Sequence, residues 1–178
     1  MKIVFCDNSL RELINFREDV INSYAEEGVL VYLIAPRNRE YIPKSDNIKI
    51  IDINVSRSGM NPINDLKYLL SLLKLYYNLK PDIVFHYTVK PNIYGSIASK
   101  LLRIPSVCMI AGLGYLYSNN NFKSRIGRQL YKFAMKFPKK IFVLNEFNKE
   151  LLISRKLVRP NQLILLKGGE GVNLKKFI

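Results

Sequence analysis

Three polar side chains, Thr88, Lys90 and Asn92, follow an apolar segment that predicts a buried strand over Ile83–Tyr87. The Lys90 ammonium would supply positive charge to a diphosphate, and the Asn92 amide would hydrogen-bond a sugar hydroxyl. Asn92 would alternatively cap the helix that the sequence predicts over Ile93–Leu102. We favour ligand contact over capping alone.

Two glycines, Gly112 and Gly114, follow the next predicted strand, Ser106–Ala111. Because glycine carries no side chain, the backbone here can approach a ligand closely. Ligands of open α/β sheets bind in the crevice beyond the carboxyl ends of the strands. The glycines and the polar residues after Tyr87 are therefore expected to meet at one crevice.

The loop Asp7-Asn8-Ser9 follows the first predicted strand and faces the same crevice. Asp7 and Asn8 would bind a sugar or a phosphate, or one of the three residues would only cap the next helix; the sequence leaves both open. Arg17 would reach a phosphate with its planar fork, or remain a solvated helix charge. No G-x-G-x-x-G sequence occurs here, which disfavours NAD and FAD.

His86 is the only histidine, and Cys6 and Cys108 are the only cysteines. His86 would act as a general base or a sugar contact, but a packed, hydrogen-bonded side chain is the favoured interpretation. Both cysteines lie in apolar strand patterns and are expected to be buried, reduced thiols. One histidine and two separated cysteines cannot complete a zinc site, so the sequence predicts no metal and no cofactor.

Strand and helix patterns alternate along the whole chain, which predicts an α/β fold with a doubly wound, mostly parallel, Rossmann-like sheet of about seven strands. We expect this domain to cover residues 1–167 and a glycine-rich interdomain hinge to begin over residues 168–178. The predicted strands are Lys2–Cys6, Val29–Ala35, Ile48–Asn54, Ile83–Tyr87, Ser106–Ala111, Lys140–Leu144 and Leu163–Lys167. The predicted helices are Arg11–Glu27, Ile63–Leu79, Ile93–Leu102, Ser124–Phe137 and Glu146–Lys156.

The net charge of +14, from 28 Lys and Arg against 14 Asp and Glu, indicates a surface that attracts polyanions. The densest basic segment predicts one helical stripe of positive charge, which would be either a solvated face or a docking surface for an anionic membrane. The opposite, apolar stripe is expected to pack on the sheet. The basic residues are Lys123, Arg125, Arg128, Lys132 and Lys136; the apolar ones are Ile126, Leu130, Phe133 and Phe137.

Charge alone also fits nucleic acid, but the sequence contains no recognisable nucleic-acid-reading motif, so nucleic acid is not an expected partner. No apolar run approaches the roughly 20 residues that span a bilayer. The N-terminal Met-Lys-Ile-Val-Phe reads as a strand, not a signal peptide. A cytoplasmic protein is the expectation from these features.

The sequence KPNIYGSIASKLLRIP, followed by a predicted strand and GLGY, resembles bacterial glycosyltransferases of family four, which have the GT-B fold. The segments KIVFCDNS, NFR, GVLVYLIAP and GGEGVNLKKF resemble the same family in the same order. The similarity is to members that build capsular polysaccharide and lipopolysaccharide. Thr88, Lys90, Pro91 and Asn92 match the Thr-x-Lys-Pro-Asn turn of relatives, whereas Ala111 replaces a histidine that many relatives carry before the first glycine.

The resemblance implies that this chain is the acceptor-binding, N-terminal half of a retaining, metal-independent glycosyltransferase. Such an enzyme transfers a sugar from a nucleotide-sugar to a lipid-linked oligosaccharide, peripherally bound at the inner face of the plasma membrane. The donor would be bound mainly by a second domain, so this chain alone is expected to be inactive. The alternative is a non-catalytic subunit that docks on the membrane and recruits a separate catalytic chain.

Overall fold

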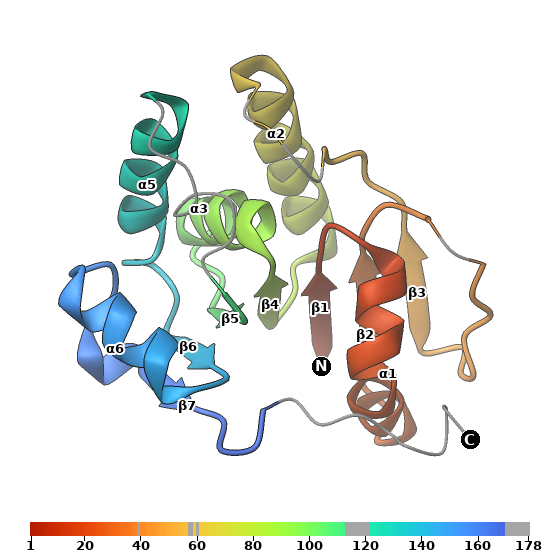
Figure 1. Cartoon of the computed structure of the whole chain (residues 1–178). Helices are drawn as coiled ribbons and strands as arrows, with labels where there is room; N and C mark the ends of the chain where they lie inside the picture. Colours follow the sequence, from red (N-terminus) through yellow and green to blue (C-terminus); the bar gives the residue numbers. More distant parts are fainter. Residues whose placement is uncertain (39, 57–58, 60, 113–121, 170–178) are drawn as a thin grey trace.

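The computed structural model describes residues 1–38, 40–56, 59, 61–112 and 122–169 (Figure 1). Seven strands form one sheet in the order β3-β2-β1-β4-β5-β6-β7, and every neighbouring pair is parallel. This arrangement confirms the predicted fold class. The strands are β1 (Lys2–Cys6), β2 (Leu30–Ile34), β3 (Ile48–Ile51), β4 (Ile83–Tyr87), β5 (Ser106–Ile110), β6 (Lys140–Val143) and β7 (Leu163–Leu165).

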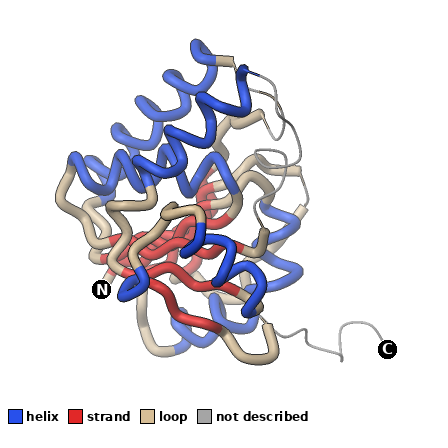
Figure 2. Tube along the Cα trace, turned by 60° about the vertical axis from the view of Figure 1, so that its left-hand side comes forward, coloured by secondary structure: helices blue, strands red, loops and turns tan. Residues whose placement is uncertain are grey.

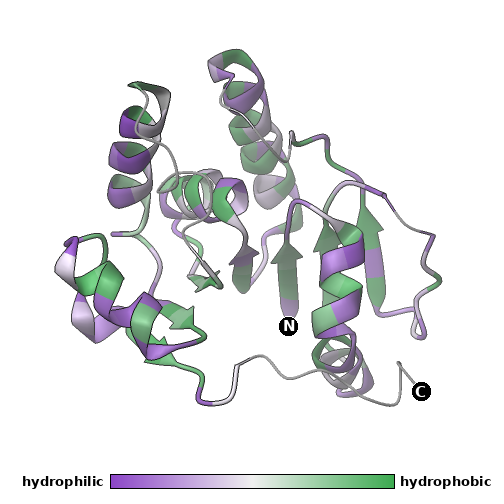
Figure 3. Ribbon diagram, viewed as in Figure 1, coloured by the Kyte–Doolittle hydropathy of each residue, from purple (hydrophilic) through white to green (hydrophobic). Residues whose placement is uncertain are grey.

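Strands β1, β4 and β5 lie at the centre of the sheet, and most of their residues are buried, as those of apolar parallel strands are when both faces are covered. Figure 3 shows that the strands of the sheet are mainly hydrophobic. The chain runs outward from β1 to β3, returns across the sheet, and continues from β4 to β7. The strand order therefore reverses between β1 and β4, the position where ligands of open α/β sheets bind.

Helix α1 (Leu10–Glu26) covers one face of the sheet through a core that includes Phe5, Leu13, Ile21 and Leu33. The other face carries the larger core, to which the remaining helices contribute (Figure 2). Those helices are α2 (Pro62–Leu79), the π-helical turn η1 (Pro91–Gly95), α3 (Ser96–Leu101), α5 (Phe122–Ala134) and α6 (Glu146–Ser154). A short 3₁₀ turn, η2 (Pro160–Gln162), leads into β7. Within the described residues, no helix is both long and apolar enough to cross a bilayer.

The helical segment after β4 begins earlier than predicted, at Val89, and passes through η1 into α3. Lys90 and Asn92 therefore lie inside this helical segment and not in a turn before it. The segment packs closely on β4 because Gly95 lies against the His86 ring, where a Cβ atom would clash. The sequence pattern missed this start because Pro91 reads as a helix boundary.

Candidate functional site

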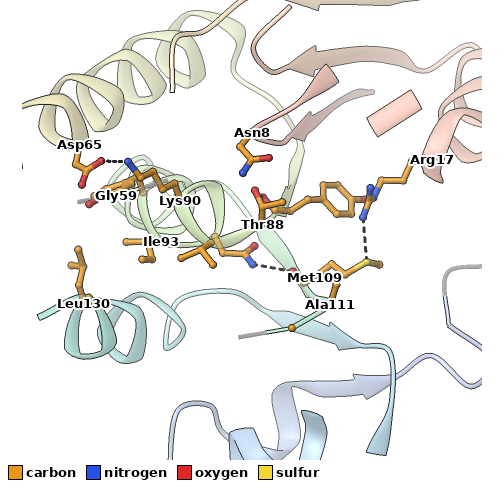
Figure 4. A pocket seen from close by; sticks show the side chains of 16 residues that line it. Asn8, Arg17, Gly59, Asp65, Thr88, Lys90, Ile93, Met109, Ala111 and Leu130 are labelled. Carbon is orange, nitrogen blue, oxygen red and sulfur yellow. Dashed lines mark hydrogen bonds and ion pairs between the residues drawn. The ribbon is translucent and has the colours of Figure 1, made fainter. Parts of the chain in front are cut away.

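A cavity of about 320 Å³ lies at the carboxyl ends of β1, β4 and β5 (Figure 4). Six of the predicted site residues line it: Asn8, Arg17, Thr88, Lys90, Asn92 and Gly112. Asp7 is buried next to the cavity and does not line it. Gly114 lies outside the described residues. Helices α2 and α5 also border the cavity, through Asp65 and through Gly127 and Leu130, none of which was predicted.

Asp7 is a buried carboxyl group that is held by its neighbours. Its Oδ1 accepts hydrogen bonds from the Asn8 backbone N–H at 2.6 Å and from the Thr88 hydroxyl at 3.4 Å, and its Oδ2 lies 3.9 Å from Arg17 Nη1. Burial raises the pKa of Asp7 to about 6, although Arg17 and the hydrogen bonds oppose that rise. Asp7 therefore titrates within reach of neutral pH.

Arg17 is buried, with its guanidinium 3.8 Å from the centre of the Tyr87 ring. It donates hydrogen bonds to the Glu12 carbonyl at 3.4 Å and to the Met109 sulfur at 3.7 Å. The alternative that Arg17 is a solvated helix charge is therefore wrong. Its position on the cavity wall leaves phosphate contact as a prediction.

Ser9 is the cap of helix α1, because its side chain accepts from the Glu12 backbone N–H and its own backbone is extended. Capping therefore does not occupy Asn8, whose Oδ1 is buried without a hydrogen-bond partner. A buried acceptor without a hydrogen-bond partner lowers the stability of the folded state. Asn8 is thus available to a ligand that carries a donor.

Asn92 is 2% exposed and does not cap a helix. Its Nδ2 donates to the Met109 carbonyl at 2.9 Å, which fixes the amide and leaves Oδ1 buried without a partner. Because Asn92 lines the cavity, this oxygen is available to a hydroxyl or N–H of a bound molecule.

Lys90 forms a close ion pair with Asp65, with Nζ 2.7 Å from Oδ1 and both side chains nearly buried. The positive charge expected for a diphosphate is therefore balanced by a carboxylate. The pair joins the helical segment after β4 to the first turn of α2. No pattern in the sequence points to Asp65, which reads only as an acidic residue in the first turn of a helix.

Thr88 adopts a left-handed backbone conformation, with φ +64°, at the end of β4. This conformation is unfavourable for a β-branched residue and costs on the order of 1–3 kcal/mol. It places the Thr88 hydroxyl between Asp7 and the cavity. Strain of this kind at a ligand-facing strand end is typical of functional sites.

His86 is fully buried beneath the helices, and its Nε2 lies 3.1 Å from the Tyr76 hydroxyl. Burial lowers the pKa of His86 to about 3, so the ring is neutral. Cys6 and Cys108 are buried free thiols, and burial raises the pKa of each to about 12. The structure thus confirms the packed interpretation of His86 and the buried, reduced interpretation of the cysteines.

Helix α5 does not pack as predicted. Its buried side consists of Ser124, Gly127, Tyr131 and Ala134, whereas Ile126 and Phe133 are exposed. Small residues let the helix approach η1 closely, so the larger apolar residues face outward. The expectation that the Ile126 and Phe133 stripe packs on the sheet is wrong; Leu130 lines the cavity and Phe137 is half-buried.

The predicted basic stripe of α5 is only partly exposed. Helix α5 ends at Ala134, earlier than predicted, so Lys136 lies in the turn after it. Arg125 and Lys136 are exposed, whereas Arg128 and Lys132 are half-buried; the side chain of Lys123 lies outside the described part of the structure. The exposed apolar side chains Phe122 (76%), Ile126 (49%) and Phe133 (51%) lie among these charges. The outer side of α5 is therefore both basic and apolar.

Comparison with known families decides the assignment. Residues 8–145 match the family model described as "Glycosyl transferase 4-like". The chain belongs to this family. The matched region runs from Asn8, at the cavity, through β4, η1 and β5 to the end of β6.

Two curated proteins that are similar to this chain act, by their names, on diphospho-undecaprenol sugars. One is the N,N'-diacetylbacillosaminyl-diphospho-undecaprenol alpha-1,3-N-acetylgalactosaminyltransferase of Campylobacter jejuni, 31% identical over 99% of this chain and 48% of the relative. The other is the UDP-Gal:alpha-D-GlcNAc-diphosphoundecaprenol alpha-1,3-galactosyltransferase of Escherichia coli, 28% identical over 74% of this chain and 34% of the relative. The chain spans half or less of the length of these relatives.

Solved structures show the same fold. Anabaena HepE in complex with UDP-glucose matches with a TM-score of 0.63 at 16% identity, covering 98% of this chain and 45% of HepE. The UDP-GlcNAc 2-epimerase of Neisseria meningitidis bound to UDP-GlcNAc matches with a TM-score of 0.64 at 20% identity, covering 93% of this chain and 45% of that enzyme. Because an epimerase shares this fold with a chain of the glycosyl transferase 4-like family, the fold alone does not give the reaction.

Proposed function

We propose that this chain is the acceptor-binding half of a glycosyltransferase that moves a sugar from a nucleotide-sugar to a lipid-linked oligosaccharide in surface polysaccharide synthesis. A single observation carries the proposal: in a family of glycosyl transferases, the cavity at the sheet's reversal point holds two buried amide oxygens without partners, on Asn8 and Asn92. Sugar hydroxyls are donors that such oxygens can accept from.

In this proposal, Asn92 Oδ1 and Asn8 Oδ1 accept hydrogen bonds from the acceptor sugar. Arg17 and Lys90 lie on the cavity wall and contact the acceptor diphosphate with their positive groups, while Asp65 holds Lys90 in place. The bare backbone at Gly112 allows close approach, and a Cβ atom there would meet nothing within 4 Å. The donor nucleotide is bound mainly by a second domain, and transfer proceeds with retention and without a metal ion.

The membrane part of the proposal rests on α5. Its exposed Arg125, and the exposed Lys136 in the turn that follows it, would contact anionic lipid, and the exposed Phe122, Ile126 and Phe133 would enter the interface. Lys123, Arg128 and Lys132 would add charge at the same surface. Such docking would bring a lipid-linked acceptor to the cavity, which α5 borders through Gly127 and Leu130.

The test is a transfer assay with a protein that carries this chain together with a second α/β domain. A short-chain prenyl-diphosphate sugar serves as acceptor, and a panel of nucleotide-sugars serves as donors. We expect one donor to be consumed and a new glycosidic bond to form with the anomeric configuration of the donor, in the presence of EDTA. The 178-residue chain alone should form no product. Failure of every donor, or product with inverted configuration, would contradict the proposal.

A further inference from the structure

The positive charge of the molecule is concentrated in one part of the chain. Between Leu66 and Asn145 there are 13 Lys and Arg residues and a single acidic residue, Asp82. Asp82 accepts a hydrogen bond from the Lys2 backbone at the amino-terminal end of β1, away from the cavity. By contrast, α1 carries four acidic residues and α6 carries two. Helices α2 and α5, on either side of α3 in Figure 1, both belong to the positive part.

Helix α2 presents an apolar stripe to the outside. Ile63 is 68% exposed, Leu66 and Leu70 are each 55% exposed, and Tyr77 is 67% exposed. Their spacing of three, four and seven residues places them on one side of the helix. The opposite side, with Tyr68, Leu72 and Tyr76, is fully buried in the core. The helix is therefore apolar on both sides, which a helix that only covers a sheet does not require.

The charges beside this stripe are all positive. Lys67 and Lys74 follow Ile63 and Leu70 by four residues and flank the stripe. The only acidic residue of α2, Asp65, is buried in its ion pair with Lys90. If two copies of α2 paired with each other, lysines would flank the contact with no carboxylate on the helix to balance them. An anionic surface, in contrast, would contact the lysines while the apolar side chains enter it.

The helix that carries the stripe also borders the cavity. Asp65, on the buried side of α2 with Tyr68 and Leu72, lines the cavity, and Gly127, next to the exposed Ile126, lines it from α5. Two helices that border the cavity therefore carry exposed apolar residues together with lysines or arginines. We infer that α2 is a second membrane-inserting helix, which together with α5 seats the cavity on an anionic lipid bilayer. This inference rests on the proposed function, and it assigns to Ile63, Leu66, Leu70 and Tyr77 the apolar part of the contact.

The chain contains no tryptophan, so one introduced indole reports on one position. Leu66→Trp places the probe in the stripe, and Phe147→Trp places a matched probe on α6, where Phe147 is 72% exposed. The 178-residue chain is mixed with vesicles of phosphatidylcholine alone or with phosphatidylglycerol, some carrying brominated acyl chains. With anionic vesicles, the Leu66→Trp emission should shift to the blue and be quenched by the bromines. The Phe147→Trp emission should do neither.

Sedimentation with the same vesicles distinguishes the contribution of α2 to membrane binding from that of α5. The variant with Leu66→Ser and Leu70→Ser should partition roughly 10-fold to 100-fold more weakly than wild type, at low and at high salt. The matched variant with Phe147→Ser and Ile153→Ser should partition like wild type. The variant with Arg125→Glu and Lys136→Glu should lose binding mainly at low salt. Circular dichroism confirms that each variant is folded.

The outcomes are distinct. If wild type binds anionic vesicles and depends on Arg125 and Lys136 but not on Leu66 and Leu70, α2 has no membrane role and the α5 contact stands. If Leu66→Trp is unchanged by vesicles and the chain sediments as a dimer that Leu66→Ser and Leu70→Ser dissociate, the stripe is a contact between copies. If wild type binds no vesicle, membrane docking fails for both helices, while the transfer assay tests the acceptor cavity separately.

Discussion

Two polar clusters lie next to each other on the central strands and differ in how their groups are satisfied. Beneath the helices, His86 pairs with Tyr76, and Cys108 contacts Ser96, in a buried and closely packed interior. The second cluster lies just past the carboxyl ends of β1 and β4. It contains Asp7, with its raised pKa, and Thr88, with its left-handed backbone. Asn8 and Asn92 keep amide oxygens without partners there. Polarity alone therefore does not mark a site; unpaired groups and strain beside a cavity do.

The packed cluster should respond to added volume with the largest loss of stability. In Gly95→Ala, the new methyl group would clash with the His86 ring, and we expect the free energy of unfolding to fall by about 3 kcal/mol. Gly112→Ala, at the cavity, meets open space and should change it by less than about 0.5 kcal/mol. Urea unfolding followed by circular dichroism measures both. Equal effects would show that the interior is not tightly packed at Gly95.

The raised pKa of Asp7 should make stability depend on pH. Burial raises this pKa from 3.8 to about 6, so between these values the folded chain binds the proton that the unfolded chain has lost. The contribution of Asp7 therefore falls as pH rises from about 4 to about 6. Asp7→Asn removes this titration. As pH rises from about 4 to about 6, the free energy of unfolding of the variant should therefore increase by about 2–3 kcal/mol relative to that of wild type. Unfolding at pH 4, 5, 6 and 7 checks it; a pH-independent difference would refute the assignment.

The strain at Thr88 should give the smallest effect. Thr88→Gly removes the penalty of the left-handed conformation, whereas Thr88→Val keeps the branched shape and loses the hydroxyl that contacts Asp7. We expect the glycine variant to be more stable than the valine variant by about 1–2 kcal/mol. Thermal unfolding of the two variants measures this difference. A valine variant as stable as the glycine variant would mean that Thr88 is not strained.

The order of strands and helices followed from the sequence because buried parallel strands are short apolar runs between helical patterns. The packing face of α5 did not follow from the sequence. Its buried side contains the small residues Ser124, Gly127 and Ala134 beside Tyr131, and small residues do not indicate which side of a helix is buried. The start of the helical segment after β4 was also missed, because Pro91 reads as a helix boundary.

The site was predictable to the extent that strand ends converge. Asn8 comes from the loop after β1, whereas Thr88 and Asn92 come from the segment after β4, yet they line one cavity because β1 and β4 are neighbours in the sheet. The ion pair between Lys90 and Asp65 was not predictable, since it depends on how α2 crosses the sheet. That the Asn8 and Asn92 oxygens have no hydrogen-bond partner is likewise known only once every neighbouring donor has been placed.

Binding of an acceptor to the chain tests the central claim most directly. Isothermal titration with a short-chain prenyl-diphosphate sugar compares Asn92→Ala with a matched variant, Asn148→Ala. Both asparagines donate their amide to a carbonyl near the end of β5 at 2.9 Å, but only Asn92 lines the cavity with an unpaired oxygen. We expect Asn92→Ala to weaken binding about 10-fold or more and Asn148→Ala to leave it within about twofold of wild type. Equal affinities for the two variants would contradict an acceptor site in this cavity.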